Sequence, residues 1–389
     1  MKAATFFVCC VIGSIVYLTF SYYYLTEDES KYPILLWWTD FVLEQETITC
    51  NKSRKCVVSG NLEHLNHNNL EAVIFYGSLL DLENMPKHNP NIYWALFHEE
   101  SPKNQPALRS LKLQQMFNIT STFSRHSTFP ITLQYLESLE ALTSLEFFVD
   151  VQVKNKLIKY REHAPILYIQ SACDTPIKRD DYVKELMKYF KVDSYGACLN
   201  NKQMPRELMS ETGTIEFYSE KLLELNSRYK FIIAIENAKC EDYITEKFWR
   251  PLIVGAIPIY LGATTIKDYL PNEKSAILMD DFHSIAALAA YITKVNNDDN
   301  LYNSYMNHKL RNQITNERLL TLFKHGGSLG QANYYYDVIP SFQCFICDAV
   351  YDKLVIDQNE KNVYDCQYPE DKTWHYSWKL GEENAERFL

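Results

Sequence analysis

The sequence predicts an α/β protein in which two parallel-sheet domains face each other across a cleft. Short apolar runs alternate with amphipathic helical segments in both halves of the chain, which is typical of parallel-sheet domains. The chain has 389 residues, enough for two domains with cores of ordinary size. The run Phe231–Ile235 is apolar throughout, as expected for a strand buried on both faces of a parallel sheet.

The N-terminal domain is expected to span residues 32–155. Three runs rich in aromatic and branched residues are typical of strands. They are PILLWW from Pro33, EAVIFYG from Glu71 and YWALFH from Tyr93. The polar residues 50–69 are expected to form a long loop, and Thr132–Phe147 a helix, because leucines recur there at helical spacing. The domain boundary is expected within residues 150–165, where the pattern is lost.

The C-terminal domain is expected to span residues 156–330. Its predicted strands are PILYIQSA from Pro165, Phe231–Ile235 and Ile257–Leu261; its predicted helices are Asp180–Phe190, Phe217–Leu225 and two segments capped by Thr245 and Ser284. Pro251 is expected to kink or break the Thr245 helix, and Gly255 to end it. Residues 331–389 are expected to be a cysteine-containing extension packed on the body.

Residues 1–26 are expected to anchor the chain in a membrane. Residues 3–26 carry no charge and include about 20 mostly apolar residues, enough for a transmembrane helix. Lys2 precedes them and an acidic stem at 27–31 follows, so the N-terminus should stay cytoplasmic. A cleaved signal peptide, the alternative, would have a shorter apolar core ending in small residues. We therefore expect a type II membrane protein with a lumenal catalytic part.

Cysteines and sequons agree with a lumenal location. Eight cysteines follow the predicted anchor, and an even number in an oxidising compartment indicates disulfides of unspecified pairing. They are Cys50, Cys56, Cys173, Cys198, Cys240, Cys344, Cys347 and Cys366. Asn51 and Asn118 begin N-glycosylation sequons. A zinc site formed by the cysteines near the C-terminus with His375 is the alternative, and the compartment disfavours it.

Composition and motifs exclude several functions. The formal net charge of −10 argues against a nucleic-acid-binding protein, because few cations would face a phosphate backbone. No G-x-G-x-x-G or P-loop sequence occurs, which argues against a dinucleotide oxidoreductase and a kinase of known motif type.

Three segments of the C-terminal half carry a family resemblance. FIIAIEN from Phe231, DYITEKFW from Asp242 and the strand to Gly262, followed by the Asp280-Asp281-Phe282 triplet, resemble the signature of the alpha-1,3-fucosyltransferase family. Upstream, HEESPKN from His98, FNITSTFSRHS and the segment 171–201 extend the resemblance over residues 90–330. It implies type II membrane enzymes of GT-B architecture that use GDP-fucose. No Asp-x-Asp occurs, so we expect no required metal.

The resemblance implies a donor site in the C-terminal domain. Arg179 and Lys247 would hold the pyrophosphate, Tyr243 would contact it, and Glu246 would accept hydrogen bonds from the ribose. A cation such as Lys247 is slightly unfavourable in the first turn of a helix, unless an anion binds there. Otherwise Glu246 and Lys247 are ordinary solvated charges. Three further donor-site candidates are Glu236, Asn237 and Arg125. The alternative role of Asn237 is to cap the following turn, and Arg125 would contact either the donor or the acceptor.

Glu100 is the predicted catalytic base. The family motif places Glu-Ser-Pro after a strand, and Pro102 keeps the preceding residue extended. The base must lie within hydrogen-bond reach of the acceptor hydroxyl, which attacks the anomeric carbon and inverts it. His98 and Glu99 are the adjacent alternatives.

The acceptor stays open in the sequence. The first expectation is alpha-1,3 transfer to GlcNAc of glycoprotein glycans in the Golgi. The Cys-bearing tail resembles a divergent branch, which implies protein O-fucosylation in the endoplasmic reticulum as the alternative. The resemblance also implies that Cys344 and Cys347 pair with Cys50 and Cys56. A non-catalytic, glycoprotein-binding lumenal protein is a rival from another class, and it would not need the full set of site residues.

Overall fold

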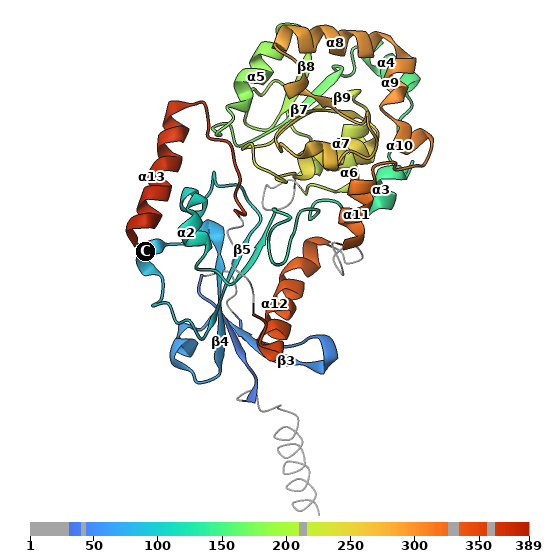
Figure 1. Cartoon of the computed structure of the whole chain (residues 1–389). Coiled ribbons are helices and arrows are strands. Elements are labelled where there is room, and N and C mark those ends of the chain that lie inside the picture. Colours follow the sequence, from blue (N-terminus) through green and yellow to red (C-terminus); the bar gives the residue numbers. More distant parts are fainter. Residues whose placement is uncertain (1–30, 40–43, 210–215, 326–333, 356–361, 389) are drawn as a thin grey trace, which may run out of the picture.

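The computed structural model describes residues 31–39, 44–209, 216–325, 334–355 and 362–388. Two separate sheets form the centres of two α/β halves, which Figure 1 shows one above the other. The predicted anchor at 1–26 and the stem up to residue 30 lie outside the described residues. Within the described ranges, no helix has the length and apolar character needed to cross a membrane.

The first sheet has six strands in the order β2-β3-β1-β4-β5-β6, and only the β2–β3 pair is antiparallel. The strands are β1 (Ile34–Trp37), β2 (Glu46–Thr49), β3 (Lys55–Ser59), β4 (Leu70–Tyr76), β5 (Tyr93–His98) and β6 (Ile119–Thr122). The three strands predicted here are confirmed. The long loop predicted at 50–69 is wrong, because Val57, Val58 and Ser59 are buried and pair in parallel with β1.

The second sheet has five parallel strands in the order β11-β10-β9-β7-β8. The strands are β7 (Ile166–Ile169), β8 (Val192–Tyr195), β9 (Phe231–Ile235), β10 (Ile257–Leu261) and β11 (Ile277–Leu278). Every residue of β9 and β10 is buried, as the apolar runs predict. An α/β fold with parallel sheets in both halves is therefore confirmed.

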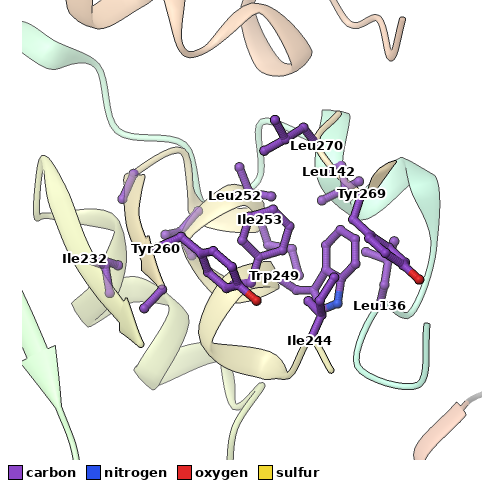
Figure 2. Packing of buried hydrophobic residues seen from close by; sticks show 14 of the residues in the cluster. Leu136, Leu142, Ile232, Ile244, Trp249, Leu252, Ile253, Tyr260, Tyr269 and Leu270 are labelled. Atoms are coloured by element: carbon purple, nitrogen blue, oxygen red, sulfur yellow. The ribbon is translucent and has the colours of Figure 1, made fainter. Parts of the chain in front are cut away.

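Helices that precede or follow its own strands cover the second sheet. They are α3 (Leu139–Thr143), α4 (Val151–Lys159), α5 (Arg179–Leu186), α6 (Glu220–Ser227), α7 (Glu246–Val254), α8 (Ile285–Asn297), α9 (Asp299–Ser304), α10 (Asn307–Leu310) and α11 (Glu317–His325). One face packs against α5 and α8 and the other against α6 and α7. Figure 2 shows Trp249 and Leu252 of α7 at the centre of the second of these cores.

Local signals set the limits of α7. The Thr245 side chain accepts a hydrogen bond from the backbone N–H of Lys247, and Gly255 ends the helix at φ +69°, which favours glycine. The break predicted at Pro251 is wrong, since the helix runs through it to Val254. Pro251 is the sixth of the nine residues of α7, and because proline has no N–H, the helix lacks the hydrogen bond to the Lys247 carbonyl.

The segment between the halves differs from its prediction. The helix predicted over Thr132–Phe147 is wrong, because only the short α3 forms and Ser138 caps it. Leu133 and Leu136 precede that cap and pack into the core of the second sheet, whereas Ile131 packs with the first. The chain thus passes from the core of the first half to that of the second near residue 132. The domain boundary expected at residue 155 instead falls inside α4.

Short helices connect the remaining elements. They are α2 (Leu111–Gln114) and the 3-10 turns η2 (Asn51–Ser53), η3 (Leu62–Asn66), η4 (Gly77–Leu79), η5 (Leu82–Asn84), η6 (Pro106–Arg109), η7 (Arg206–Leu208), η8 (Ile266–Asp268) and η9 (Met279–Asp281). Among the described residues of the first half, the longest helix between strands has five residues. Such helices are too short to cover a sheet.

Two helices of the C-terminal tail cover the first sheet instead. Phe342 and Ile346 of α12 (Tyr334–Asp352) pack on one face, and Trp378 of α13 (Lys372–Phe388) packs on the other. In Figure 1 these helices are red and lie beside the blue and cyan first half. Helix α13 approaches η6 closely at Gly381. A Cβ added to Gly381 would lie 2.5 Å from the Cβ of Pro106, which is too close for a side chain.

Four disulfides join the cysteines of the described chain. They are Cys50–Cys344, Cys56–Cys347, Cys173–Cys198 and Cys240–Cys366. The first two tie α12 to the hairpin of β2 and β3, which confirms the implied partners and settles their pairing. The alternative zinc site is excluded for these cysteines, because disulfide sulfurs are not thiolate ligands.

Candidate functional site

The two halves meet at the carboxyl ends of their central strands. Glu100 follows β5 of the first sheet, and Asn237 follows β9 of the second. The side-chain nitrogen Nδ2 of Asn237 donates to Oε2 of Glu100 at 3.4 Å. The hydroxyl of buried Ser101 donates to the side-chain oxygen Oδ1 of Asn237 at 2.6 Å. This is the edge at which open parallel sheets bind ligands.

Residues 236–245, here called the crossover loop, connect β9 to α7 and reach into the first half. Ala238, Cys240 and Tyr243 are buried in the core of the first half. Cys240 is bonded to Cys366 of the tail, and the Tyr243 ring packs edge-on against Phe123. The loop therefore carries second-half residues to the Glu100 side of the interface.

Glu100 lies where the crossover loop meets the first sheet. The Tyr243 hydroxyl donates to its Oε2 at 2.9 Å. Among the described residues, its Oε1 has no hydrogen-bond partner, so one carboxylate oxygen is left for a substrate hydroxyl. Tyr243, which the resemblance assigned to the pyrophosphate, instead donates to the predicted base in this structure.

The two alternative bases have other environments. His98 is fully buried, its Nδ1 lies 2.8 Å from the Tyr364 hydroxyl, and burial lowers its pKa to about 3. Glu99 accepts a 2.8 Å hydrogen bond from the Tyr76 hydroxyl, and burial raises its pKa. Neither side chain contacts Asn237 or Tyr243. Of the three, only Glu100 is hydrogen-bonded to the crossover loop.

Glu236 ends β9 as a fully buried carboxylate. It accepts hydrogen bonds from the backbone N–H and the hydroxyl of Thr245, both at 2.8 Å. Its burial, which the nearby cation of Lys247 only partly offsets, raises its pKa to about 7. Glu236 therefore fixes the start of α7, and it changes charge near neutral pH.

Glu246 and Lys247 form an ion pair in the first turn of α7. The Lys247 Nζ lies 3.1 Å from Oε1 of Glu246 and 3.8 Å from Oε2 of Glu236. Burial opposes both charges, but the pair outweighs it: the pKa of Glu246 is lowered and that of Lys247 is raised. With its side chain 18% exposed, Lys247 stays charged and accessible to an anion.

Arg179 begins α5 and is 1% exposed. Its guanidinium donates to the carbonyl of Ile235 at 3.3 Å and to that of Ala172 at 2.6 Å. Within the described part of the chain it forms no ion pair, and its Nε has no partner. Buried charges are usually paired, so this cation lacks an anion.

A cavity of about 950 Å³ opens beside these groups. The carboxyl ends of β7 and β8 and the start of α7 form its walls. Its lining includes Ser171, Ala172, Gly196, Met204, Phe217, Glu246, Lys247 and Arg250. Ala172 joins it to Arg179, since the Ala172 carbonyl accepts from the guanidinium. The lining thus combines cations with apolar side chains.

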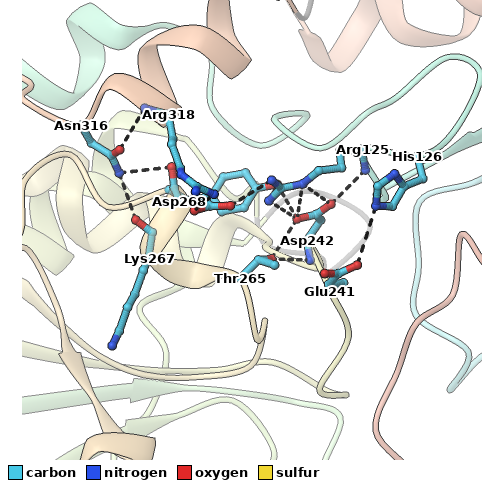
Figure 3. A network of polar contacts seen from close by, with 10 residues as sticks. Arg125, His126, Glu241, Asp242, Thr265, Lys267, Asp268, Asn316 and Arg318 are labelled. Carbon is cyan, nitrogen blue, oxygen red and sulfur yellow. Dashed lines mark hydrogen bonds and ion pairs between the residues drawn. The ribbon is translucent and has the colours of Figure 1, made fainter.

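Arg125 does not line this cavity. Its guanidinium binds the buried carboxylate of Asp242 at 2.6 Å and that of Asp268 at 2.9 Å (Figure 3). Two carboxylates therefore already compensate its charge. The structure brings Glu100, Asn237, Tyr243, Glu236, Glu246, Lys247 and Arg179 around one interface and places Arg125 in a separate ion-pair network.

The sequence reasoning missed Ser101 as the partner of Asn237 and missed Tyr135 altogether. Tyr135 lies in the segment between the halves, and the Tyr218 hydroxyl donates to its backbone carbonyl. Burial, and then the carboxylates of Glu100 and Glu246, raise the pKa of its phenol well above the ordinary value. Ser101 had a signal in the Glu-Ser-Pro triplet, but nothing in the sequence marks Tyr135.

The sequons lie apart from this interface. Asn51 is in an exposed turn, and its amide nitrogen donates to Asp348 at 2.9 Å. Asn118 precedes β6, and its side-chain oxygen accepts from the Trp94 backbone N–H at 2.8 Å. Glycosylation at either position stays a prediction.

Cys173, Asp180 and Cys198 lie close enough together to be considered as metal ligands. The two cysteines form a disulfide, however, so they offer no thiolate to a metal ion.

Comparisons with known proteins agree with one another. Residues 159–353 match the family model "Glycosyltransferase family 10 (fucosyltransferase) C-term", and residues 29–135 match "Fucosyltransferase, N-terminal". The chain is 43% identical over 326 residues to GDP-fucose protein O-fucosyltransferase 3 of Homo sapiens, covering 82% of this chain and 66% of that protein. It is 40% identical over 356 residues to the Xenopus laevis protein of that name, covering 90% and 72%.

The chain thus spans about two thirds of the human relative's length. Among solved structures, an alpha1,3-fucosyltransferase with GDP-fucose matches with a TM-score of 0.43 and 15% identity, over 76% of this chain and 90% of that one. Another, with GDP, matches with a TM-score of 0.44 and 15% identity, over 77% and 92%. At these TM-scores the likeness carries no argument about the site.

Proposed function

The chain belongs to glycosyltransferase family 10, the fucosyltransferases, and from this premise we propose that it transfers L-fucose from GDP-fucose to a Ser or Thr hydroxyl of a folded protein. Relatives named for protein O-fucosylation favour this acceptor over the GlcNAc acceptor that the sequence analysis put first. We also assign the GT-B architecture to the pair of sheets, with donor site and base on opposite sides of the interface.

Arg179 is the observation that carries the donor assignment. A buried guanidinium without an anionic partner is unfavourable unless a ligand supplies the anion. Lys247 lies on the same side of the interface and reaches the cavity, so the two cations suit a nucleoside diphosphate. The apolar side chains of the lining, such as Met204 and Phe217, suit a stacked base.

Glu100 is assigned the role of general base. It would take the proton of the acceptor hydroxyl, while that oxygen bonds to the anomeric carbon and the bond from this carbon to the β-phosphate oxygen breaks. The departing GDP keeps the electron pair, and its charge is stabilised by Arg179 and Lys247. Attack from the face opposite the leaving group turns a β-linked donor into an α-linked product.

A donor and acceptor panel tests this proposal. The purified full-length chain is incubated with GDP-fucose, GDP-mannose or UDP-sugars, and with either folded protein domains or GlcNAc-terminated glycans. We expect GDP release and acceptor fucosylation only with GDP-fucose and a protein acceptor. Transfer to GlcNAc would establish the glycan acceptor instead. Donor binding without transfer to any acceptor would support the non-catalytic rival.

We propose that the reaction requires no metal. The site already offers two cations to the diphosphate, which is the task of a metal in enzymes that use one. Activity in excess EDTA should equal activity without it. A complete loss in EDTA that manganese restores would contradict this proposal.

We propose further that residues 1–26 anchor the chain as a type II protein, with the catalytic part in the lumen of the Golgi or the endoplasmic reticulum. The four disulfides support an oxidising compartment. Protease protection of a C-terminal tag in sealed microsomes tests the orientation. Digestion of the tag without detergent would contradict it, and co-staining would separate the two compartments.

A further inference from the structure

The ion pair between Arg125 and Asp242 connects the two halves beside the crossover loop. Arg125 follows β6 of the first sheet, whereas Asp242 lies in the crossover loop of the second half. Asp242 accepts from the Arg125 backbone N–H at 3.0 Å, from its Nε at 2.9 Å and from its Nη2 at 2.6 Å. The contact is therefore multidentate, which adds geometric specificity to charge.

Asp242 is held from a third direction as well. Its carboxylate also accepts from the hydroxyls of Thr265 and Tyr269, each at 2.8 Å, and its backbone is left-handed at φ +59°. Its side chain is fully buried, and these donors, Arg125 foremost among them, outweigh burial and lower its pKa. A carboxylate with this many donors has one orientation, and so does the backbone that bears it.

A buried ion pair gives little net stability, because the desolvation of both charges offsets their attraction. Its effect here is on position. The next residue, Tyr243, donates to Glu100, and the preceding Cys240 is bonded to Cys366. A loop fixed at Cys240 and at Asp242 leaves the Tyr243 hydroxyl a narrow range of positions relative to Glu100.

We propose that Arg125 and Asp242 are positioning residues, which align Tyr243 with the catalytic base across the two halves. This inference rests on the proposed function. It replaces the expectation that Arg125 contacts the donor, because Asp242 and Asp268 already occupy its guanidinium. The Arg125–Asp242 contact drawn in Figure 3 thus acts on the reaction through the crossover loop rather than through a substrate.

Variants of the full-length chain test the proposal. Asp242→Asn and Arg125→Gln should lower kcat on the order of 10²-fold, the cost of misplacing a catalytic group by about 1 Å. The KM for GDP-fucose and the affinity for GDP should change less than about threefold, and Arg125→Lys should recover part of the loss. Arg318→Ala is the matched control: Arg318 pairs with Asp268 from the solvent side, so wild-type kcat is expected.

A double-mutant cycle separates positioning from general damage. If Asp242 acts through Tyr243, the losses from Asp242→Asn and Tyr243→Phe should not multiply when combined. Multiplying losses, or unchanged kcat in Asp242→Asn, would overturn the proposal. Hydrogen exchange gives a readout independent of transfer: amides of residues 237–245 should exchange at least about tenfold faster in Asp242→Asn, while β9 stays protected.

These readouts also distinguish this inference from the proposed function. An inactive wild type with faster loop exchange in Asp242→Asn would reject the function and retain the ion pair as the positioning element. An active wild type with unchanged exchange and unchanged kcat in the variant would retain the function and reject the positioning role.

Discussion

The two sheets bury their faces in different ways. The second sheet is covered by helices that alternate with its own strands, such as α5 and α7. The first sheet has only short helices between strands and takes α12 and α13 from the end of the chain, more than 200 residues beyond its last strand. Two disulfides hold α12 there. Hence the second half is assembled from local sequence, whereas the first depends on long-range contacts.

This difference affects the site as well. The proposed donor residues lie on the second half, where short connections set helix starts such as that of α7. The proposed base lies on the first half, and the crossover loop and the tail fix its surroundings. Arg109 illustrates this dependence: it pairs with Glu382 of α13 and lies between the rings of Tyr368 and Trp378. A change in the C-terminal tail should therefore alter the position of Glu100 more than it alters the affinity for the donor.

The largest effect should come from removing both disulfides of α12, with all four cysteines Cys50, Cys56, Cys344 and Cys347 changed to alanine. These bonds close loops of more than 290 residues, so the loop-entropy relation gives a loss on the order of 5 kcal/mol. The loss should be confined to the first half. Hydrogen exchange should show a lower opening free energy for amides of β1 and β4, and little change for β9 and β10.

Removal of Cys173–Cys198 is the matched control. That bond closes a separation of 25 residues within the second half, and the same relation gives roughly 3 kcal/mol. Its effect should appear in β7 and β8 and leave the first sheet intact. If either variant lowered the opening free energy equally in both sheets, the two halves would unfold as one unit. The proposed difference between a locally assembled half and a tail-dependent half would then be wrong.

The second effect concerns the base. Glu100→Gln should lower kcat by about 10²- to 10⁴-fold, the usual contribution of a general base, which corresponds to about 3–5 kcal/mol. GDP affinity by calorimetry should stay within about twofold, since the donor residues lie on the other half. Glu99→Gln is the control and should retain most activity, because the hydrogen bond of the Glu99 side chain is to Tyr76 of the first sheet and not to the crossover loop. A larger loss in Glu99→Gln would move the base to Glu99.

Local pattern predicted the second half better than the first. Strands β9 and β10 coincide with their apolar runs, and the cap at Thr245 and the end at Gly255 are where the sequence indicates. The break expected at Pro251 does not occur, because the buried packing of α7 outweighs the one hydrogen bond that proline removes. In the first half, β3 was missed: it is a five-residue strand whose burial depends on α12, almost 300 residues away.

The candidate site shows the same limit. A contiguous motif can specify the positions of adjacent residues, as it does for Glu246 and Lys247 in the first turn of α7. The partner of a motif residue is set by tertiary packing instead: Arg125 was expected to contact donor or acceptor, and packing adds an ion pair with Asp242 that no motif indicates. Tyr135 approaches Glu100 and Glu246 from a segment with no recognisable pattern. Sequence therefore identified residue types but not which residues face each other.

The third effect tests the donor side. Lys247→Ala should weaken GDP binding by about 1.5–3 kcal/mol, the range for hydrogen bonds to charged groups, or roughly 10- to 150-fold. The first sheet and its disulfides should be unaffected. Lys184→Ala is the control, since Lys184 is an exposed lysine of α5 whose partner is Asp181. Unchanged calorimetric affinity in Lys247→Ala would remove this lysine from the donor site.

The smallest effect is a pH dependence that differs between the halves. The pKa of Glu236, at the second sheet, is raised from 4.5 to about 7 by burial. Its protonated form is favoured in the folded state, so stability from Glu236 is present below pH 4.5 and is lost as pH rises through 7. The pKa of His98, at the first sheet, is lowered from 6.5 to about 3. Stability from neutral His98 is present above pH 6.5 and falls on acidification.

Differences between wild type and variant isolate these two groups from all others that titrate. From pH 7 to pH 5, wild type should gain about 2 kcal/mol relative to Glu236→Gln and lose about 2 kcal/mol relative to His98→Gln, at 1.36 kcal/mol per pKa unit. Urea unfolding at both pH values measures each difference. The same sign in both comparisons would show that one of the two pKa values shifts in the direction opposite to the one that burial favours. That result would remove the electrostatic part of the contrast between the halves.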